Sequence, residues 1–105
     1  MPELQILAAA AEEAEAAIRW YEYEQPELGK QLRATFDAAL DQLEAGTLAG
    51  SSMPGPIGIQ GVRRLVLRRF PYSLVFIPRD STITILAFAH HSRRPSYWRS
   101  RGPRV

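Results

Sequence analysis

The spacing of the apolar residues changes once along this chain of 105 residues, and that change most constrains the fold. Between residues 9 and 45, apolar side chains recur every three or four positions, which is the period of an amphipathic helix. Pro26 interrupts this stretch and suits the first turn of a new helix, and Gly46 suits a C-terminal cap. We therefore expect a helical hairpin with a very short connection, made of helices over residues 9–24 and 26–45.

Strand-like runs rich in Val, Ile, Leu, Phe and Thr follow, at residues 62–70, 72–77 and 82–90. Short turns join them, so they predict an antiparallel meander of three strands. A short apolar run at residues 3–8 predicts a strand before the helices, whereas the Gly-, Ser- and Pro-rich residues 46–60 predict a loop. The expected fold is therefore α+β, in a single domain over residues 1–105.

The last of these runs is apolar on both of its faces. If side chains alternate along the strand, Ile83, Ile85 and Ala87 point to one face, and Leu86 and Phe88 point to the other. A strand that is apolar on both faces needs cover on both. The helical hairpin can cover one face, and the other is covered either by another polypeptide or by the C-terminal segment folding back. The sequence leaves these two alternatives open.

Charge is distributed very unevenly along the chain. Residues 1–45 hold three basic and ten acidic residues, a formal charge of −7, whereas residues 46–105 hold ten basic residues and one acidic residue, a formal charge of +9. All ten bases of the second half are arginines, which favour bidentate contacts to phosphate or carboxylate. This asymmetry indicates an acidic partner for the second half. The alternative is that the charge only keeps the surface soluble.

Cysteine is absent, which excludes a disulfide framework and a thiolate metal site. The N-terminus has no basic region before its apolar run, and Glu12 and Glu13 break that run, so it is neither a signal peptide nor a membrane span. We expect a cytoplasmic protein without a membrane partner. His90 and His91 are adjacent and point to opposite sides of an extended chain, so we expect no metal site and no cofactor.

Four arginines lie on the first strand of the meander, where alternation places Arg63 and Arg69 on one face and Arg64 and Arg68 on the other. Such charges cannot be buried without partners, so they line an open face, a groove or an edge, or they pair with carboxylates. We interpret these four residues as candidate target- or anion-binding residues. A phosphate chain or an acidic segment of a partner would serve equally well.

The C-terminal stretch "AHHSRRPSYWRSR" combines residue types found at ribonuclease sites. His91 is a candidate acid or base, Arg93 and Arg94 are candidate phosphate ligands, and Tyr97 could stack on a base or orient a phosphate. Cleavage of RNA by an internal 2′-hydroxyl requires a base, an acid and cations around the phosphate. The alternative is that Tyr97 and Trp98 pack on the sheet while the arginines remain solvated.

Three segments together resemble the RelE/ParE superfamily of type II toxin–antitoxin toxins, also described as plasmid stabilisation proteins. They are "AIRWYEYEQPELGKQL", "VRRLVLRRFPYSLVF" and "ILAFAHHSRRPSYWRSR". The resemblance implies a strand, two helices, three strands and a short final helix. It also implies a small antitoxin whose acidic, partly disordered tail wraps the toxin in a hetero-oligomer. On the sheet face left uncovered, we interpret Leu86, Phe88 and Trp98 as antitoxin-binding residues.

The superfamily divides by target, and the resemblance implies different chemistry for each branch. RelE-like toxins cut mRNA on the ribosome and tend to carry an arginine after the tyrosine of the middle strand, whereas ParE-like toxins poison DNA gyrase. Ser73 follows Tyr72 here, which favours the ParE-like branch and a toxin that acts by binding. His91, Arg93 and Tyr97 are catalytic only if the chain is a ribonuclease. An inactive family member or a nucleic-acid-binding module is a further alternative.

Overall fold

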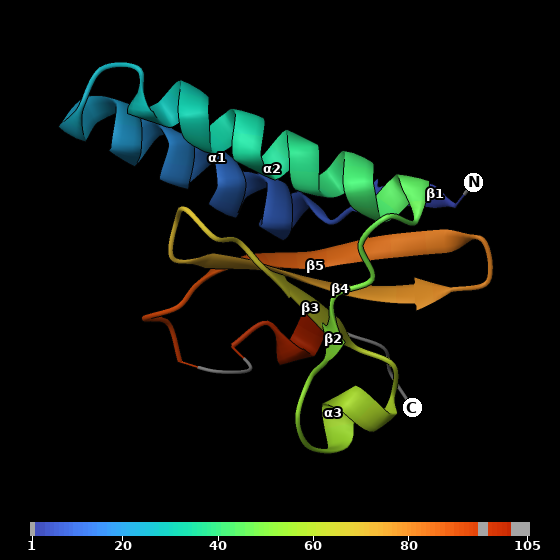
Figure 1. Cartoon of the computed structure of the whole chain (residues 1–105). Helices are drawn as coiled ribbons and strands as arrows, with labels where there is room; N and C mark the ends of the chain where they lie inside the picture. The colour runs from blue at the N-terminus through green and yellow to red at the C-terminus, as the bar shows by residue number, and fades with distance from the viewer. Residues whose placement is uncertain (1, 95–96, 102–105) are drawn as a thin grey trace.

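The computed structural model describes residues 2–94 and 97–101. It consists of a helical hairpin that lies across one face of a five-stranded sheet, with shorter segments on the opposite face (Figure 1). The strands are β1 (Glu3–Ile6), β2 (Ser51–Ser52), β3 (Arg63–Val66), β4 (Tyr72–Arg79) and β5 (Thr82–His90). The helices are α1 (Ala8–Glu24), α2 (Leu28–Ala45), the four-residue α3 (Pro56–Ile59) and a short 3₁₀ helix (Arg99–Arg101).

The strand order in the sheet is β1-β5-β4-β3-β2. The predicted meander is confirmed, because β3 pairs antiparallel with β4 and β4 pairs antiparallel with β5. The N-terminal strand pairs parallel with β5, and this pairing runs from Glu3 opposite Thr82 to Ile6 opposite Ile85. Beyond Ile85 the chain of β1 turns into α1, so the last residues of β5 have no strand beside them on that edge.

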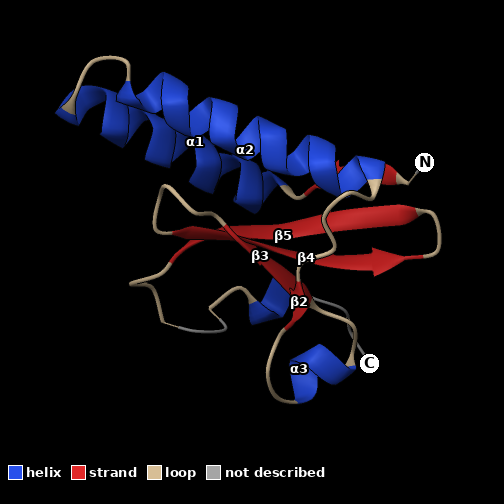
Figure 2. Cartoon of the chain, viewed as in Figure 1, coloured by secondary structure: helices blue, strands red, loops and turns tan. Residues whose placement is uncertain are grey.

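The helical hairpin is confirmed, but its connection differs from the prediction (Figure 2). Pro26 lies in the connection rather than in the first turn of α2, and the two N–H groups of Glu27 and Gly29 donate hydrogen bonds of 2.9 and 3.0 Å to the Glu22 carboxylate. A β-carbon at Gly29 would lie 2.5 Å from the backbone oxygen of Ile18. Glycine is therefore required at this position because the two helices approach closely there.

The predictions for residues 46–60 and 62–70 are wrong in part. Residues 46–60 are not only a loop, because they contain β2 and α3. The strand predicted over residues 62–70 ends at Val66, since the chain bends so that Leu67 donates a hydrogen bond to the carbonyl oxygen of Tyr72 and Phe70 packs in the core. Arg68 and Arg69 therefore lie in a bend, and the expected alternation of the four arginines holds only for Arg63 and Arg64.

A β-bulge in β5 corrects the predicted facing of its side chains. Val75 pairs with Ala87 and Phe76 pairs with Ile85, so Leu86 has no residue opposite it. One extra residue inverts the alternation that follows it. As a result, Phe88 packs with Ile85 beneath the helices, whereas Leu86 and Ala87 pack on the opposite face.

The opposite face of the sheet is covered by segments of the same chain. Ile57 of α3, Val62 before β3 and Trp98 of the C-terminal segment pack against it. Figure 1 shows α3 and the C-terminal segment on the side of the sheet away from the helical hairpin. Of the two alternatives left open by the sequence, the chain uses its own residues, and α3 contributes cover that the sequence did not predict.

Candidate functional site

Three arginines and two histidines, His90 and His91, line a hollow on the sheet face opposite the hairpin. Arg64 comes from β3, whereas His91, Arg93 and Arg94 follow the end of β5, where the N–H of Arg93 donates a hydrogen bond to the carbonyl oxygen of His90. We call this hollow the basic pocket; its volume is about 310 Å³. Its other lining residues include Met53, Ser73, Val75, Ala89, Tyr97 and Trp98.

One of the two histidines of the basic pocket, His91, has a hydrogen-bond partner on β4. The Ser73 hydroxyl oxygen and the His91 Nε2 atom are 2.9 Å apart. Ser73 is a buried residue of β4, whereas His91 is exposed. The backbone N–H of His91 donates a hydrogen bond to the carbonyl oxygen of Pro71. The hydroxyl of Ser73 is therefore placed to orient the His91 imidazole.

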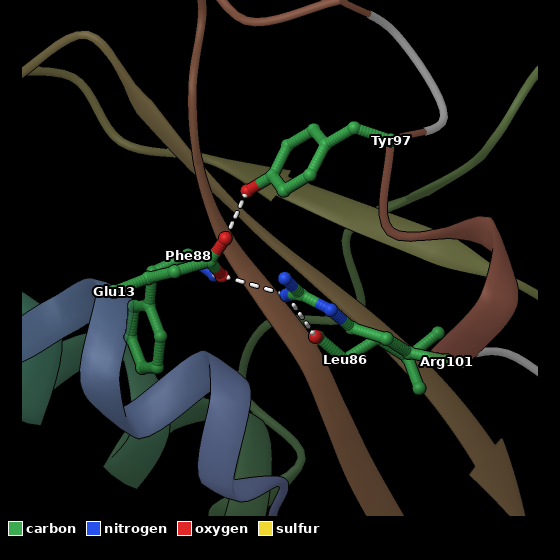
Figure 3. Close-up of polar contacts among 5 residues, drawn as sticks. All are labelled: Glu13, Leu86, Phe88, Tyr97 and Arg101. Atoms are coloured by element: carbon green, nitrogen blue, oxygen red, sulfur yellow. Dashed lines mark hydrogen bonds and ion pairs between the residues drawn. The ribbon is translucent and has the colours of Figure 1, made fainter.

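A single carboxylate on α1 joins the helix, β5 and the C-terminal segment (Figure 3). Tyr97 donates its hydroxyl proton to Glu13 Oε2 at 2.6 Å, and Arg101 Nη1 donates to Glu13 Oε1 at 2.9 Å. The backbone N–H of Phe88 also donates to Glu13 Oε1 at 3.2 Å, and Arg101 Nη1 donates to the carbonyl oxygen of Leu86 at 3.2 Å. Glu13 and Arg101 thus satisfy backbone groups on the part of β5 that β1 does not reach.

The environment of Tyr97 keeps its hydroxyl protonated. Burial raises the pKa of Tyr97 far above its ordinary value, and the hydrogen bond to Glu13 raises that pKa further. The Arg93 guanidinium lies over the Tyr97 ring at 3.9 Å from its centroid. Tyr97 is therefore placed to hold Arg93 and to donate to Glu13, whereas its raised pKa makes it a poor general base at neutral pH.

The six arginines predicted to bind an anion do not form one site. Arg64, Arg93 and Arg94 line the basic pocket. Arg63 instead donates hydrogen bonds to the carbonyl oxygens of Ala49 and Gly50, at 2.9 and 3.0 Å, and so anchors the segment before β2. Arg68 and Arg69 line a separate hollow of about 750 Å³ between α2 and β3. Arg69 also forms a hydrogen bond with the Gln31 side chain.

The three residues predicted to contact an antitoxin are buried within this chain. Leu86, Phe88 and Trp98 are 2%, 3% and 2% exposed. Leu86 and Trp98 belong to the core on the pocket face, and Phe88 belongs to the core beneath the helices. The expectation that they lie on an uncovered face is therefore wrong, because α3 and the C-terminal segment cover the face of Leu86 and the helices cover Phe88.

Sequence reasoning missed Glu13 and Ser73. Glu13 was visible as an anomaly, since it lies at helical spacing between Ala10 and Ala17 on the buried side of α1, where a carboxylate needs partners. Its partners could not be identified because they follow it in the sequence by 75 to 88 residues. Ser73 was noted only for the branch of the superfamily that it favours, and nothing in the sequence pointed to its contact with His91.

Within residues 2–94 and 97–101, no group of three or more His, Asp or Glu side chains is placed to hold a metal ion. In that same described part of the chain, no helix is both long and apolar enough to cross a membrane.

Comparisons with known proteins agree with this architecture. The sequence model for the ParE toxin of the type II toxin–antitoxin system parDE matches residues 4–95. A solved structure described as a chromosomal ParDE toxin–antitoxin system from P. aeruginosa superposes with a TM-score of 0.72 at 27% identity, covering 86% of this chain and 96% of that chain. None of the curated protein sequences matches this chain significantly. Because the family match extends over most of the sequence, this chain belongs to the ParE toxin family of type II toxin–antitoxin systems.

Proposed function

We propose that this chain stops growth by binding its target, with DNA gyrase as the first candidate, and that a small antitoxin neutralises it. Membership of the ParE toxin family supports the toxin role, and the similarity to a ParDE toxin–antitoxin structure supports an antitoxin as partner. Gyrase is the first candidate target because the chain belongs to the ParE toxin family, and the mode of action is argued from the chemistry of the basic pocket.

The observation that carries the binding mode is the engagement of Tyr97. Its hydroxyl donates to Glu13 at 2.6 Å, and its pKa is raised, so it does not serve as a base that removes the proton of a ribose 2′-hydroxyl. The His91 Nε2 atom lies 2.9 Å from the Ser73 hydroxyl and is already engaged. The pocket therefore offers cations for binding, while one of its candidate proton-transfer groups, Tyr97, is held by Glu13.

The test begins with inducible expression of the chain alone and together with its cognate antitoxin. We expect growth to stop without the antitoxin and to recover with it. Purified toxin is then added to a gyrase supercoiling assay and to a ribosome-dependent mRNA cleavage assay. Inhibited supercoiling with intact mRNA supports the proposal, whereas normal growth without the antitoxin overturns it and favours an inactive member or a nucleic-acid-binding module.

A ribosome-dependent mRNA endoribonuclease is the second candidate. One observation favours it: His91 and Arg93 line the same hollow as Arg64, so an imidazole and two guanidinium groups face a common space. This candidate predicts that His91→Ala abolishes mRNA cleavage while antitoxin binding persists. Binding to gyrase predicts instead that no cleavage is detected and that His91→Ala leaves the inhibition of supercoiling largely intact.

A further inference from the structure

The basic pocket gathers more positive charge than the described part of the chain balances. Arg64, Arg93 and Arg94 line it, and within residues 2–94 and 97–101 no carboxylate lines the pocket and none of the three forms an ion pair. Arginines that lack an acidic partner and line one hollow are suited to an oxyanion. We propose that the basic pocket binds a phosphate group, carried by a nucleic-acid backbone.

The directions of approach favour phosphate over carboxylate. Arg64 enters from β3, whereas Arg93 and Arg94 enter from the segment after β5, so the donors come from two elements of the fold. A planar carboxylate accepts hydrogen bonds mainly in its own plane and is best matched by one bidentate arginine. The tetrahedral oxygens of a phosphate accept donors from several directions.

The size of the basic pocket is consistent with a nucleotide unit. Its volume of about 310 Å³ is at the lower end of the range of about 300–1,000 Å³ found for small-molecule sites. Apolar side chains such as Met53 and Val75 line the hollow beside the arginines. A phosphate at the guanidinium groups would therefore leave room for the sugar attached to it.

Glu13 and Tyr97 act on this site as positioning residues. The Arg93 guanidinium lies 3.9 Å from the centroid of the Tyr97 ring, and the Tyr97 hydroxyl is held at 2.6 Å by Glu13. Glu13 is itself fixed by Arg101 at 2.9 Å, and this ion pair offsets the negative charge that would otherwise repel a phosphate. Glu13 on α1 thus positions the Arg93 guanidinium through the Tyr97 ring.

This inference deepens the proposed function, because it names the chemical group through which the pocket would contact a target that holds nucleic acid. It is tested without toxicity or gyrase, so the two proposals can fail separately. Loss of phosphate binding would leave a toxin that binds its target through other contacts. Phosphate binding without growth arrest would leave a nucleic-acid-binding module.

The binding assay uses the only two tryptophans of the chain. Trp20 is 57% exposed, so Trp20→Phe leaves the buried, pocket-lining Trp98 as the single tryptophan reporter. This full-length protein is titrated with a short single-stranded DNA oligonucleotide, with inorganic phosphate and with poly-glutamate. We expect a saturable change in Trp98 fluorescence with the oligonucleotide at low salt, and a weaker response to inorganic phosphate.

Matched arginine variants distinguish the pocket from general charge. Arg64→Gln and Arg94→Gln should each weaken oligonucleotide binding about tenfold. Each should also lower the slope of log binding constant against log salt concentration by about 1, which corresponds to one phosphate contact. The control is Arg79→Gln, which removes the same charge from an exposed position at the far end of β4 and should change neither quantity. Thermal unfolding of each variant verifies that it is folded.

Three outcomes overturn the proposal. The first is that Arg79→Gln weakens binding as much as the pocket variants do, which would indicate attraction by net charge alone. The second is that poly-glutamate binds as tightly as the oligonucleotide, which would indicate a site for an acidic peptide. The third is that the folded protein gives no saturable response to the oligonucleotide or to phosphate. If phosphate alone binds and the oligonucleotide does not, the site takes a free phosphate and the nucleic-acid part is wrong.

The positioning role is tested by a double-mutant cycle. Tyr97→Phe keeps the ring beneath Arg93 but frees that ring from Glu13, so it should weaken oligonucleotide binding about threefold. In an Arg93→Gln background the same change should have no further effect, because Tyr97 acts through Arg93 alone. An equal loss in both backgrounds would mean that Tyr97 has a general structural role and would remove it from the site.

Discussion

The two faces of the sheet differ in what covers them. On the helix face, α1 and α2 bury large apolar residues such as Phe36, Leu74 and Phe76 in one continuous core. On the pocket face, the cover is a four-residue helix and a C-terminal segment that is tied to the rest of the chain through Glu13. Apolar burial supplies most of a protein's stability, so the helix face stabilises the fold while the pocket face leaves charged groups free to bind.

Adjacent residues of β4 give the largest expected contrast between the two faces. Phe76 packs beneath the helices and Val75 packs on the pocket face, and each is 2% exposed. We expect Phe76→Ala to lower the free energy of unfolding by about 3–5 kcal/mol, and Val75→Ala by about 2 kcal/mol. Urea denaturation measures both. Because phenylalanine loses more buried carbon atoms than valine, equal losses would show that the pocket face contributes more stability per buried atom and would contradict this contrast.

The close approach of the two helices should be the next most sensitive feature. Gly29→Ala places a β-carbon 2.5 Å from the backbone oxygen of Ile18, so the helices must separate, at a cost of about 1–3 kcal/mol. The matched control is Ala34→Gly, which removes a β-carbon from α2 and should cost about 1 kcal/mol through helix propensity alone. An unchanged unfolding midpoint for Gly29→Ala would show that the hairpin relaxes freely.

A smaller effect is expected where the C-terminal segment is tied down. Tyr97→Phe removes the hydrogen bond to Glu13 and should lower the free energy of unfolding by about 1 kcal/mol. Amide hydrogen exchange should become faster at Trp98 and Arg101 while it stays slow at Phe36 in α2. Faster exchange throughout both faces would contradict the separation between them.

The smallest effect concerns acid stability of the hairpin connection. The N–H groups of Glu27 and Gly29 lower the pKa of Glu22 below its ordinary value of 4.5. The charged carboxylate therefore stabilises the fold above that pH, and this contribution is lost as the pH falls through the lowered pKa. Glu22→Gln should reduce stability at pH 7 and make its decline below pH 4.5 shallower, which thermal unfolding at several pH values measures. A parallel decline would show that Glu22 does not contribute.

The helical hairpin and the meander could be predicted because each depends on local patterns. The spacing of Leu32, Phe36 and Leu43 determines the buried face of α2, and the run of apolar residues determines β4. The bulge at Leu86 could not be predicted, since alternation in the sequence continues unchanged through it. Its consequence is that Leu86 and Phe88, which sequence spacing places together, lie on opposite faces of the sheet.

The candidate site divides in the same way. Charge and residue type in the sequence pointed to Arg64, Arg93 and Arg94, because arginines without nearby acids indicate an anion. The same reasoning also selected Arg63 and Arg69, which the fold uses to hold the segment before β2 and to contact α2. Composition cannot separate these two uses of an arginine, since the difference depends on which backbone segment passes beside it.

The sequence by itself therefore determined the order of the helical hairpin and of the four longer strands, the uneven charge and the resemblance to the toxin superfamily. These properties follow from periodicity, composition and short motifs, which act over a few residues. Only the tertiary structure decided that the chain covers its own second face and that Glu13 on α1 reaches Tyr97 and Arg101. Both outcomes depend on contacts between residues far apart along the chain, and a local pattern does not contain them.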